Sequence, residues 1–176
     1  PLNALYDSFC QLDAERNDNT NTPLSLANTR SRLRMATLYY FASQERFLVA
    51  GTGNKVEDFG VGFYTKYGDG GVDVSPIADL MKSQVRELAA HLGVHSSIVH
   101  AAPTDGLWDD NRTDEDQLGA TYDELEWAMK QQENGKNVAN FTDREQTVFN
   151  IYEKHHTMNK HKMVPIPVCV IPQHLK

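Results

Sequence analysis

The sequence has few cysteines, no excess of basic residues and no long apolar run. Its 176 residues include only Cys10 and Cys169, so a disulfide framework is excluded as the basis of the fold, and nothing resembles a secretory leader. The net charge of -7 argues against non-specific nucleic-acid binding, which needs a basic excess. No apolar stretch is long enough to span a bilayer. We therefore expect a globular, cytoplasmic protein with neither nucleic acid nor membrane as a partner.

The apolar pattern of the first half predicts helices and short strands in a single domain. Helical spacing predicts a helix over 2–12, and the threonine–proline pair at 22–23 predicts the start of a long helix that ends near Ser43. The run over 47–50 predicts a buried strand, and 72–74 a second extended segment. The polar residues between the two helices predict a loop over 13–21. This alternation favours an α/β fold with a parallel sheet, although the expected strands are too few to build one.

The second half carries clear helix boundaries. Ser75–Pro76 predicts that helical structure restarts there, and Gly93 predicts its end. Threonine followed three residues later by glutamate, at 121–124 and 142–145, fits the capping box and predicts two more helices. From residue 163 onward the prolines forbid helix and predict an extended tail; they are Pro165, Pro167 and Pro172.

A glycine-rich segment over 51–71 follows the first predicted strand, where α/β folds bind ligands. It is not a dinucleotide fingerprint, because Val56 stands where the third glycine is needed. The cluster over 67–71 would let the backbone approach a ligand, with Asp69 supplying a carboxylate. An ordinary Asp-Gly hairpin turn explains the same residues, and the segment alone does not decide between them.

The charged residues give weaker signals when each is taken alone. On a helix Arg30 and Arg34 share a face, whereas Arg32 points nearly opposite, so the three cannot all reach one ligand. Lys82 lies near a helix start, where anions bind, but a surface lysine is the simpler interpretation. Glu57 offers one oxygen ligand for magnesium. Two further groups favour solvated surface over a metal site: the histidines His155, His156 and His161, and the acidic run 109–116.

Taken in order, seven segments resemble the NAD synthetase family, which uses ATP to amidate deamido-NAD. The resemblance covers nearly the entire chain, and it implies an adenine-nucleotide α-hydrolase-like fold, that is, a Rossmann-like parallel sheet with flanking helices, in a homodimer. The segments are NTRSRLRM, AGTGNKVE, FYTKYGDGG, SPIADLMKSQVRELAAHLG, PTDGLW, DEDQLGATYDELE and HKMVPIP.

The resemblance also implies roles for individual residues. The ATP contacts are Thr52, Lys82 and Thr104. The deamido-NAD contacts are Arg32, Lys66, Asp73, His161 and Lys162. Glu57 matches the magnesium-binding glutamate, and Asp69 matches an aspartate beside the ammonia. We expect Mg²⁺ and ATP in the reaction, with deamido-NAD and ammonia as the other substrates.

The chain also departs from the family pattern. The Ser-Gly-Gly-x-Asp-Ser pyrophosphate loop and the amino-terminal strands that carry it are absent, so residues 1–176 are expected to be the carboxy-terminal portion of one synthetase domain, inactive alone. Gly53-Asn54-Lys55 replaces an Asp-His-Ala found in some members, and one extra residue separates Glu57 from Lys66. No glutaminase domain is present, which favours ammonia as the nitrogen donor. The alternatives are a glutamine-hydrolysing NAD synthetase, a non-catalytic nucleotide-binding or dimerisation fragment, and a GMP synthetase.

Overall fold

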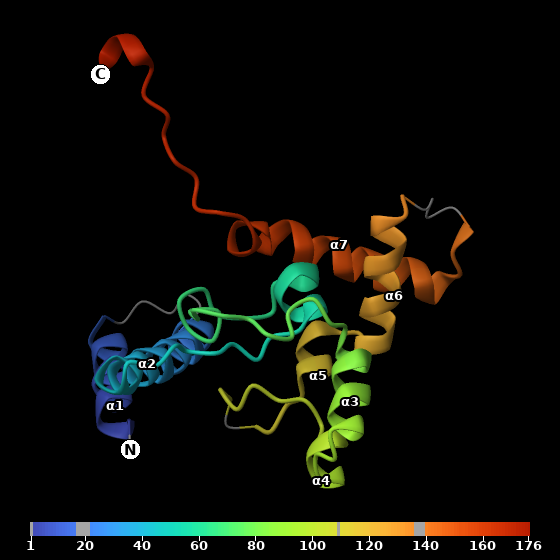
Figure 1. Cartoon of the computed structure of the whole chain (residues 1–176), viewed down its shortest axis with the longest axis horizontal. Helices are drawn as coiled ribbons and strands as arrows, with labels where there is room; N and C mark the ends of the chain where they lie inside the picture. The colour runs from blue at the N-terminus through green and yellow to red at the C-terminus, as the bar shows by residue number, and fades with distance from the viewer. Residues whose placement is uncertain (1, 17–21, 109, 136–139) are drawn as a thin grey trace.

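The computed structural model describes residues 2–16, 22–108, 110–135 and 140–176 (Figure 1). These residues form mainly helices, which follow one another along the chain as α1 (Asn3–Arg16), α2 (Thr22–Glu45), the π-helix η1 (Val56–Val61), α3 (Lys82–His91), α4 (Ser96–Val99), α5 (Asp114–Leu118), α6 (Tyr122–Glu133), α7 (Asp143–Met163) and the 3-10 helix η3 (Gln173–Leu175). Within these described ranges no helix is long and apolar enough to cross a membrane.

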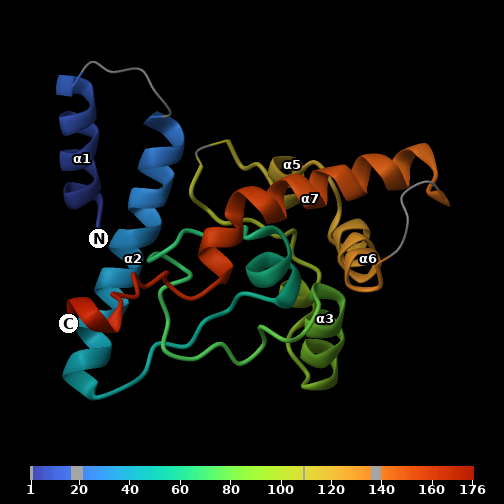
Figure 2. The ribbon, with the colours of Figure 1, turned by 90° about the horizontal axis from the view of Figure 1, so that it is seen from above.

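The core lies where η1, α6 and α7 pack together, with α3 against α6 (Figures 1 and 2). Tyr122 and Leu125 of α6 meet Val148 and Tyr152 of α7, all at most 1% exposed. Burying one such side chain contributes about 1.5–3 kcal/mol, so this cluster stabilises the fold more than α1 and α2, which pack as a separate helical pair. Of these two helices only α2 has buried residues, and it has just Ala27 and Ser31.

Several predicted helix ends are confirmed. Both predicted capping boxes form, with Thr121 accepting from the Glu124 N–H and Thr142 from the Glu145 N–H. The long helix α2 starts at the expected pair, and Gly93 adopts a φ of +74° just beyond α3. The tail is extended after α7 and projects away from the body, as predicted (Figure 1), but the expectation of no helix from residue 163 onward is wrong at Met163, the last residue of α7, and at Gln173–Leu175, which form η3 beyond the last proline.

Other boundaries were predicted wrongly. Helix α1 runs on through residues 13–16, which the polar composition assigned to a loop, while 17–21 of that loop lie outside the described residues. Helix α3 begins at Lys82 rather than near Ser75–Pro76, because residues 76–79 form turns. Glu15 and Arg16 are exposed, and a helix surface accommodates such polar side chains as well as a loop does.

The expected parallel sheet is wrong for the described residues, which contain one isolated parallel bridge, from Ala50 to Val74. The predicted buried strand is largely open to solvent, with Phe47 70% and Leu48 73% exposed, although Val49 is buried. A sheet gains its stability from several paired strands with a covered face, and one bridge provides neither. The bridge is parallel, as expected, and it holds segment 47–50 beside 72–74.

Candidate functional site

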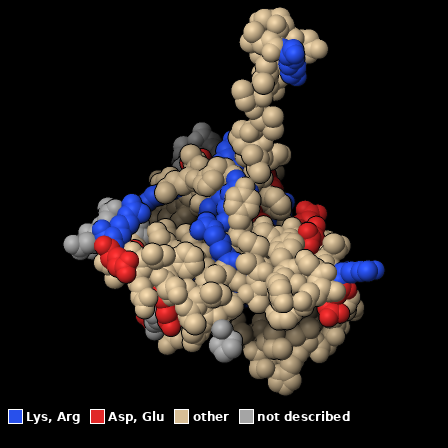
Figure 3. All heavy atoms as spheres, turned by 90° about the vertical axis from the view of Figure 1, so that its left-hand side faces the viewer, with Lys and Arg blue, Asp and Glu red and all other residues tan. Residues whose placement is uncertain are grey.

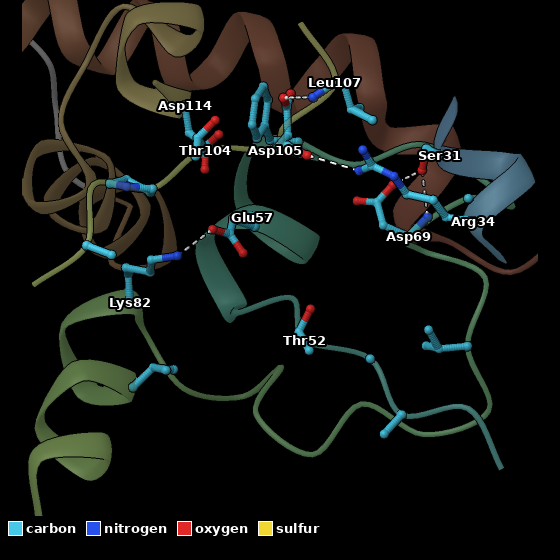
Figure 4. Close-up of a pocket in the computed structure, with 18 of the residues that line it drawn as sticks. Ser31, Arg34, Thr52, Glu57, Asp69, Lys82, Thr104, Asp105, Leu107 and Asp114 are labelled. Carbon is cyan, nitrogen blue, oxygen red and sulfur yellow. Dashed lines mark hydrogen bonds and ion pairs between the residues drawn. The ribbon is translucent and has the colours of Figure 1, made fainter. Parts of the chain in front are cut away.

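A cavity of about 800 Å³ opens between α2, the segment after the bridge, η1, α3 and the loop before α5 (Figure 4). The sequence-predicted residues that line it are Thr52, Glu57, Asp69, Lys82 and Thr104. They come from parts of the chain up to about fifty residues apart, and the fold brings them together around the cavity. Arg34, Asp105 and Asp114 also line the cavity, although the sequence assigned none of them to the site.

Glu57 is the centre of the polar wall of this cavity. Its Oε1 accepts a hydrogen bond from the Tyr122 hydroxyl at 2.5 Å and pairs with Lys82 Nζ at 3.0 Å, while Oε2 accepts the Asn54 N–H at 3.2 Å. The Tyr122 hydroxyl also lies 3.2 Å from Asp114 Oδ2. Burial, with the nearby charge of Glu57, raises the pKa of Tyr122, so this hydroxyl keeps its proton and acts as a donor.

The turn before η1 explains why the chain uses small and polar residues there. Asn54, which is 1% exposed, accepts the backbone N–H groups of Val56 and Glu57 with its side-chain oxygen, and so caps the first turn of η1. A Cβ on Gly53 would lie 2.2 Å from a carboxylate oxygen of Asp58. The glycine therefore allows a close approach, and the Asn54 cap aims Glu57 at the cavity.

Asp69 is held against α2 by reciprocal hydrogen bonds. Its Oδ1 accepts from Ser31 Oγ at 2.7 Å and from the Thr65 N–H at 2.9 Å, and its own N–H donates to Ser31 Oγ (Figure 4). A Cβ on Gly68 would meet Ser31 Oγ at 2.2 Å, which explains a glycine at that position. The hairpin alternative is wrong for these described residues, because 66–70 form consecutive turns and do not join two paired strands.

The arginines of α2 divide between two faces, as the helical geometry predicts. Arg34 lines the cavity and donates to the carbonyls of Asp105 and Gly106, and Arg30 donates to the Leu107 carbonyl. Arg32 lies outside the cavity lining and donates to the Lys66 carbonyl, and its contact with deamido-NAD stays a prediction.

Lys66, His161 and Lys162 form a second group at the end of α7. Lys66 Nζ donates to the His161 carbonyl at 2.7 Å, and Lys162 Nζ donates to the carbonyls of Gly62 and Tyr64. Burial lowers the pKa of Lys162. Figure 3 shows basic side chains near the base of the tail, on the side of the molecule that carries α2. This group ties the end of α7 to the glycine-rich segment.

Asp73 lies outside both the cavity lining and the group at the end of α7. Its carboxylate Oδ2 accepts the Val49 N–H at 2.9 Å, so it supports the bridged segments. It does not line the cavity. A role in ligand binding for Asp73 stays a prediction.

Lys82 is the first residue of α3, as predicted near a helix start, but backbone donors at this helix start already have acceptors within the protein. Glu126 of α6 already accepts the Ser83 N–H at 2.8 Å and Ser83 Oγ at 2.7 Å, and the Gln84 side chain accepts the Met81 N–H. These donors at the start of α3 are therefore engaged, and Lys82 contributes through its ammonium group. Sequence reasoning missed Glu126, because only the packing of α6 on α3 brings it there.

No group of three or more His, Cys, Asp or Glu side chains converges as a metal site in the described part of the chain. The acidic run is mostly surface, as expected: Asp110 pairs with Arg112, and Asp116 with its capping partner Thr113. Asp109, its first member, lies outside the described residues. Asp114 differs from the rest of the run, since it is buried and lines the cavity.

Comparison with known proteins gives consistent matches. Residues 1–165 match the NAD synthase family. The chain is 43% identical over 142 residues to the NH(3)-dependent NAD(+) synthetase of Mesoplasma florum, a match that covers 79% of this chain and 57% of that protein. The chain therefore spans little more than half the length of this relative.

Two solved structures are similar over almost the whole chain. The NMN synthetase from Francisella tularensis matches with a TM-score of 0.73 at 32% identity, over 97% of this chain and 63% of that one. The NH3-dependent NAD synthetase from Campylobacter jejuni matches with a TM-score of 0.70 over 96% of this chain and 63% of that one. The second likeness, at 22% identity, shows a shared fold only.

Proposed function

The chain belongs to the NAD synthase family, and we propose that it supplies the nucleotide-binding cavity of an ammonia-dependent NAD synthetase. In that reaction the carboxylate of deamido-NAD is adenylylated by ATP, pyrophosphate leaves, and ammonia attacks the acyl-adenylate with release of AMP. The observation that carries the proposal is the convergence of Thr52, Glu57, Lys82 and Thr104 on one cavity. A cavity of about 800 Å³ lies within the range of small-molecule sites.

The side chains of the cavity suit adenylyl transfer in which the protein forms no covalent bond to the substrates. Lys82 would neutralise charge on the ATP phosphates, because its flexible ammonium can leave Glu57 for a phosphate oxygen. The hydroxyls of Thr52 and Thr104 would donate hydrogen bonds to the nucleotide and fix its orientation. Positioning of this kind, together with electrostatic stabilisation, lowers most of the barrier to transfer of a phosphate-containing group.

Magnesium fits the donor set at Glu57, since carboxylate oxygens are its preferred protein ligands. When bound, it supplies a positive charge that stabilises the developing charge on the phosphates. The Tyr122 hydroxyl and the Asn54 N–H orient the Glu57 carboxylate for this role. A magnesium ion at Glu57 would replace the present ion pair between Glu57 and Lys82.

Asp69 would hold ammonium and accept one of its protons, since ammonia is mainly ammonium at neutral pH. Its attachment to Ser31 and Thr65 keeps the carboxylate at the cavity wall. In an active synthetase that contains this chain, Asp69→Asn should raise the ammonium concentration needed for half-maximal rate. An unchanged ammonium dependence would exclude this role.

A homodimer is part of the same proposal. Helix α2 leaves Leu24, Leu38 and Phe41 more than half exposed, which supports its use as an interface. Sedimentation or light scattering of the purified chain should give twice its 19.8 kDa mass. A strictly monomeric chain would rule out dimerisation through these residues.

Calorimetric titration tests the nucleotide sites. The chain should bind ATP and deamido-NAD, and Lys82→Ala should weaken ATP binding while the exposed control Lys130→Ala does not. Equal ATP affinity in both variants would contradict the placement of Lys82 at the ATP phosphates. If both nucleotides bind but mixing them releases no pyrophosphate, the chain acts as a binding module rather than an enzyme. Binding of xanthosine monophosphate in place of deamido-NAD would favour a GMP synthetase.

A second candidate substrate is a mononucleotide. The match at 32% identity to the NMN synthetase favours it, because that protein's product is half of the NAD dinucleotide. Titration with nicotinic acid mononucleotide beside deamido-NAD separates the two candidates. Preference for the mononucleotide would assign this chain to the same activity.

A further inference from the structure

Asp114 is a buried carboxylate that the proposed reaction does not use. It lies at the start of α5, is only 7% exposed and lines the cavity (Figure 4). Its Oδ1 atom is buried and has no hydrogen-bond partner. Because a buried charged oxygen without a partner is costly, native proteins keep such groups where a ligand, an ion or a reacting group satisfies them.

The neighbouring donors do not satisfy Asp114. The Tyr122 hydroxyl has a single proton, and it lies 2.5 Å from Glu57 Oε1 against 3.2 Å from Asp114 Oδ2, so the proton goes to Glu57. Lys82 also pairs with Glu57. Glu57 therefore receives the local donors, and Asp114 is left with the longer contact alone.

Acidic side chains outnumber basic ones in the lining of this cavity. Glu57, Asp69, Asp105 and Asp114 line it against Lys82, Arg34 and Arg86, and Lys82 is the cation paired with Glu57. A cation that arrives with an anionic nucleotide would reduce the repulsion between its phosphates and the carboxylates of Glu57 and Asp114. Magnesium binds through one or two carboxylates, with water and substrate phosphates completing its shell, so it does not need three converging protein ligands.

We propose that Asp114 is a second carboxylate, contributed by this chain, of a divalent-cation site that includes Glu57, with the Tyr122 hydroxyl within hydrogen-bond distance of both side chains. This rests on the proposed function, because the phosphates of a bound nucleotide complete the coordination. The site takes a hard cation such as Mg²⁺ or Mn²⁺. Asp114 is joined to Glu57 through Tyr122, so the site draws residues from η1, α5 and α6.

Mn²⁺ binding tests the proposal without any need for turnover. The electron paramagnetic resonance signal of free Mn²⁺ would be titrated with the 176-residue chain, with and without α,β-methylene-ATP. The variants are Asp114→Asn and Glu57→Gln, and the control is Asp123→Asn, which removes the same charge from an exposed position on α6. Calorimetry would measure binding of the nucleotide analogue separately, and thermal unfolding would be followed without Mn²⁺.

Asp114→Asn should weaken Mn²⁺ binding about tenfold or more, the scale at which groups at a metal act, and Asp123→Asn should leave it unchanged. The same variant should unfold at an equal or higher temperature without Mn²⁺, since it removes an uncompensated charge. A lower unfolding temperature with Mn²⁺ affinity within twofold of the parent would overturn the proposal in favour of a structural role.

The outcomes also separate this proposal from the proposed function. Loss of Mn²⁺ binding in Glu57→Gln but not in Asp114→Asn would reject Asp114 and keep the Glu57 site. Binding of the analogue without any Mn²⁺ uptake by the parent chain would reject the cation site and keep the nucleotide cavity. Failure to bind the analogue at all would reject the proposed function, and the cation site with it.

Discussion

Glu126 determines how the start of α3, and Lys82 with it, is held against α6. Its carboxylate is only 4% exposed and accepts two hydrogen bonds from Ser83, through the backbone N–H at 2.8 Å and the hydroxyl at 2.7 Å. Ser83 follows Lys82, whose ammonium reaches Glu57. Glu126→Ala would remove both bonds and leave the N–H without its acceptor.

The cost of this change can be worked from those contacts. A hydrogen bond to a charged group contributes about 1.5–3 kcal/mol, so the loss of two should lower the free energy of unfolding by about 3 kcal/mol or more. Glu126→Gln keeps one oxygen for the Ser83 N–H and a side chain of the same size. We expect that variant to cost about 1 kcal/mol.

Urea unfolding measures the difference. With a slope of about 2 kcal/mol per molar urea, Glu126→Ala should lower the midpoint by about 1.5 M. Glu87→Ala, at an exposed position of α3, is the matched control and should change the midpoint little. Because Lys82 loses its support, ATP binding should also weaken in Glu126→Ala. A midpoint within about 0.3 M of the parent would refute the argument that Glu126 anchors α3.

Three further predictions concern pH, backbone conformation and surface charge. Burial, and then the charge of Glu57, raises the pKa of Asp58 to about 6, so the folded state holds this proton more tightly than the unfolded state does. The contribution of Asp58 to the free energy of unfolding should therefore fall as pH rises from about 4 to 6. Urea midpoints measured across that range should show this loss in the parent and not in Asp58→Asn. Gly62→Ala should lower the free energy of unfolding by about 2–4 kcal/mol, because Gly62 has a φ of +64° and a Cβ there would lie 2.4 Å from Asn159 Cβ. Gly93→Ala is the control: its φ is +74° with no atom within 4 Å of the new Cβ, so it should cost only about 1–2 kcal/mol. Equal losses in urea unfolding would contradict the steric explanation. Arg144→Ala removes an exposed ion pair with Glu124 and should cost at most about 1 kcal/mol in the same assay; a loss of several would show that this pair does more than a surface contact.

Interactions between residues close in sequence determined several helix starts and the extended tail. Threonine–glutamate capping pairs start α6 and α7, and prolines keep the tail extended, because each of these effects acts within a few residues. Helical periodicity also separated Arg32 from Arg34 correctly. Family resemblance then placed Thr52, Glu57 and Lys82 at one site, and all three line the cavity.

Long-range packing decided the rest. Segment 47–50 has the composition of a buried strand, yet burial depends on neighbours, and its described partner is a single bridge to Val74. Tyr122 reaches Glu57 from a position 65 residues away and also contacts Asp114, and no local spacing encodes the contact with Glu57. Glu126 likewise meets α3 only because α6 packs on it. Capping and periodicity are written into neighbouring residues, whereas the environment of a carboxylate exists only once distant helices have packed around it.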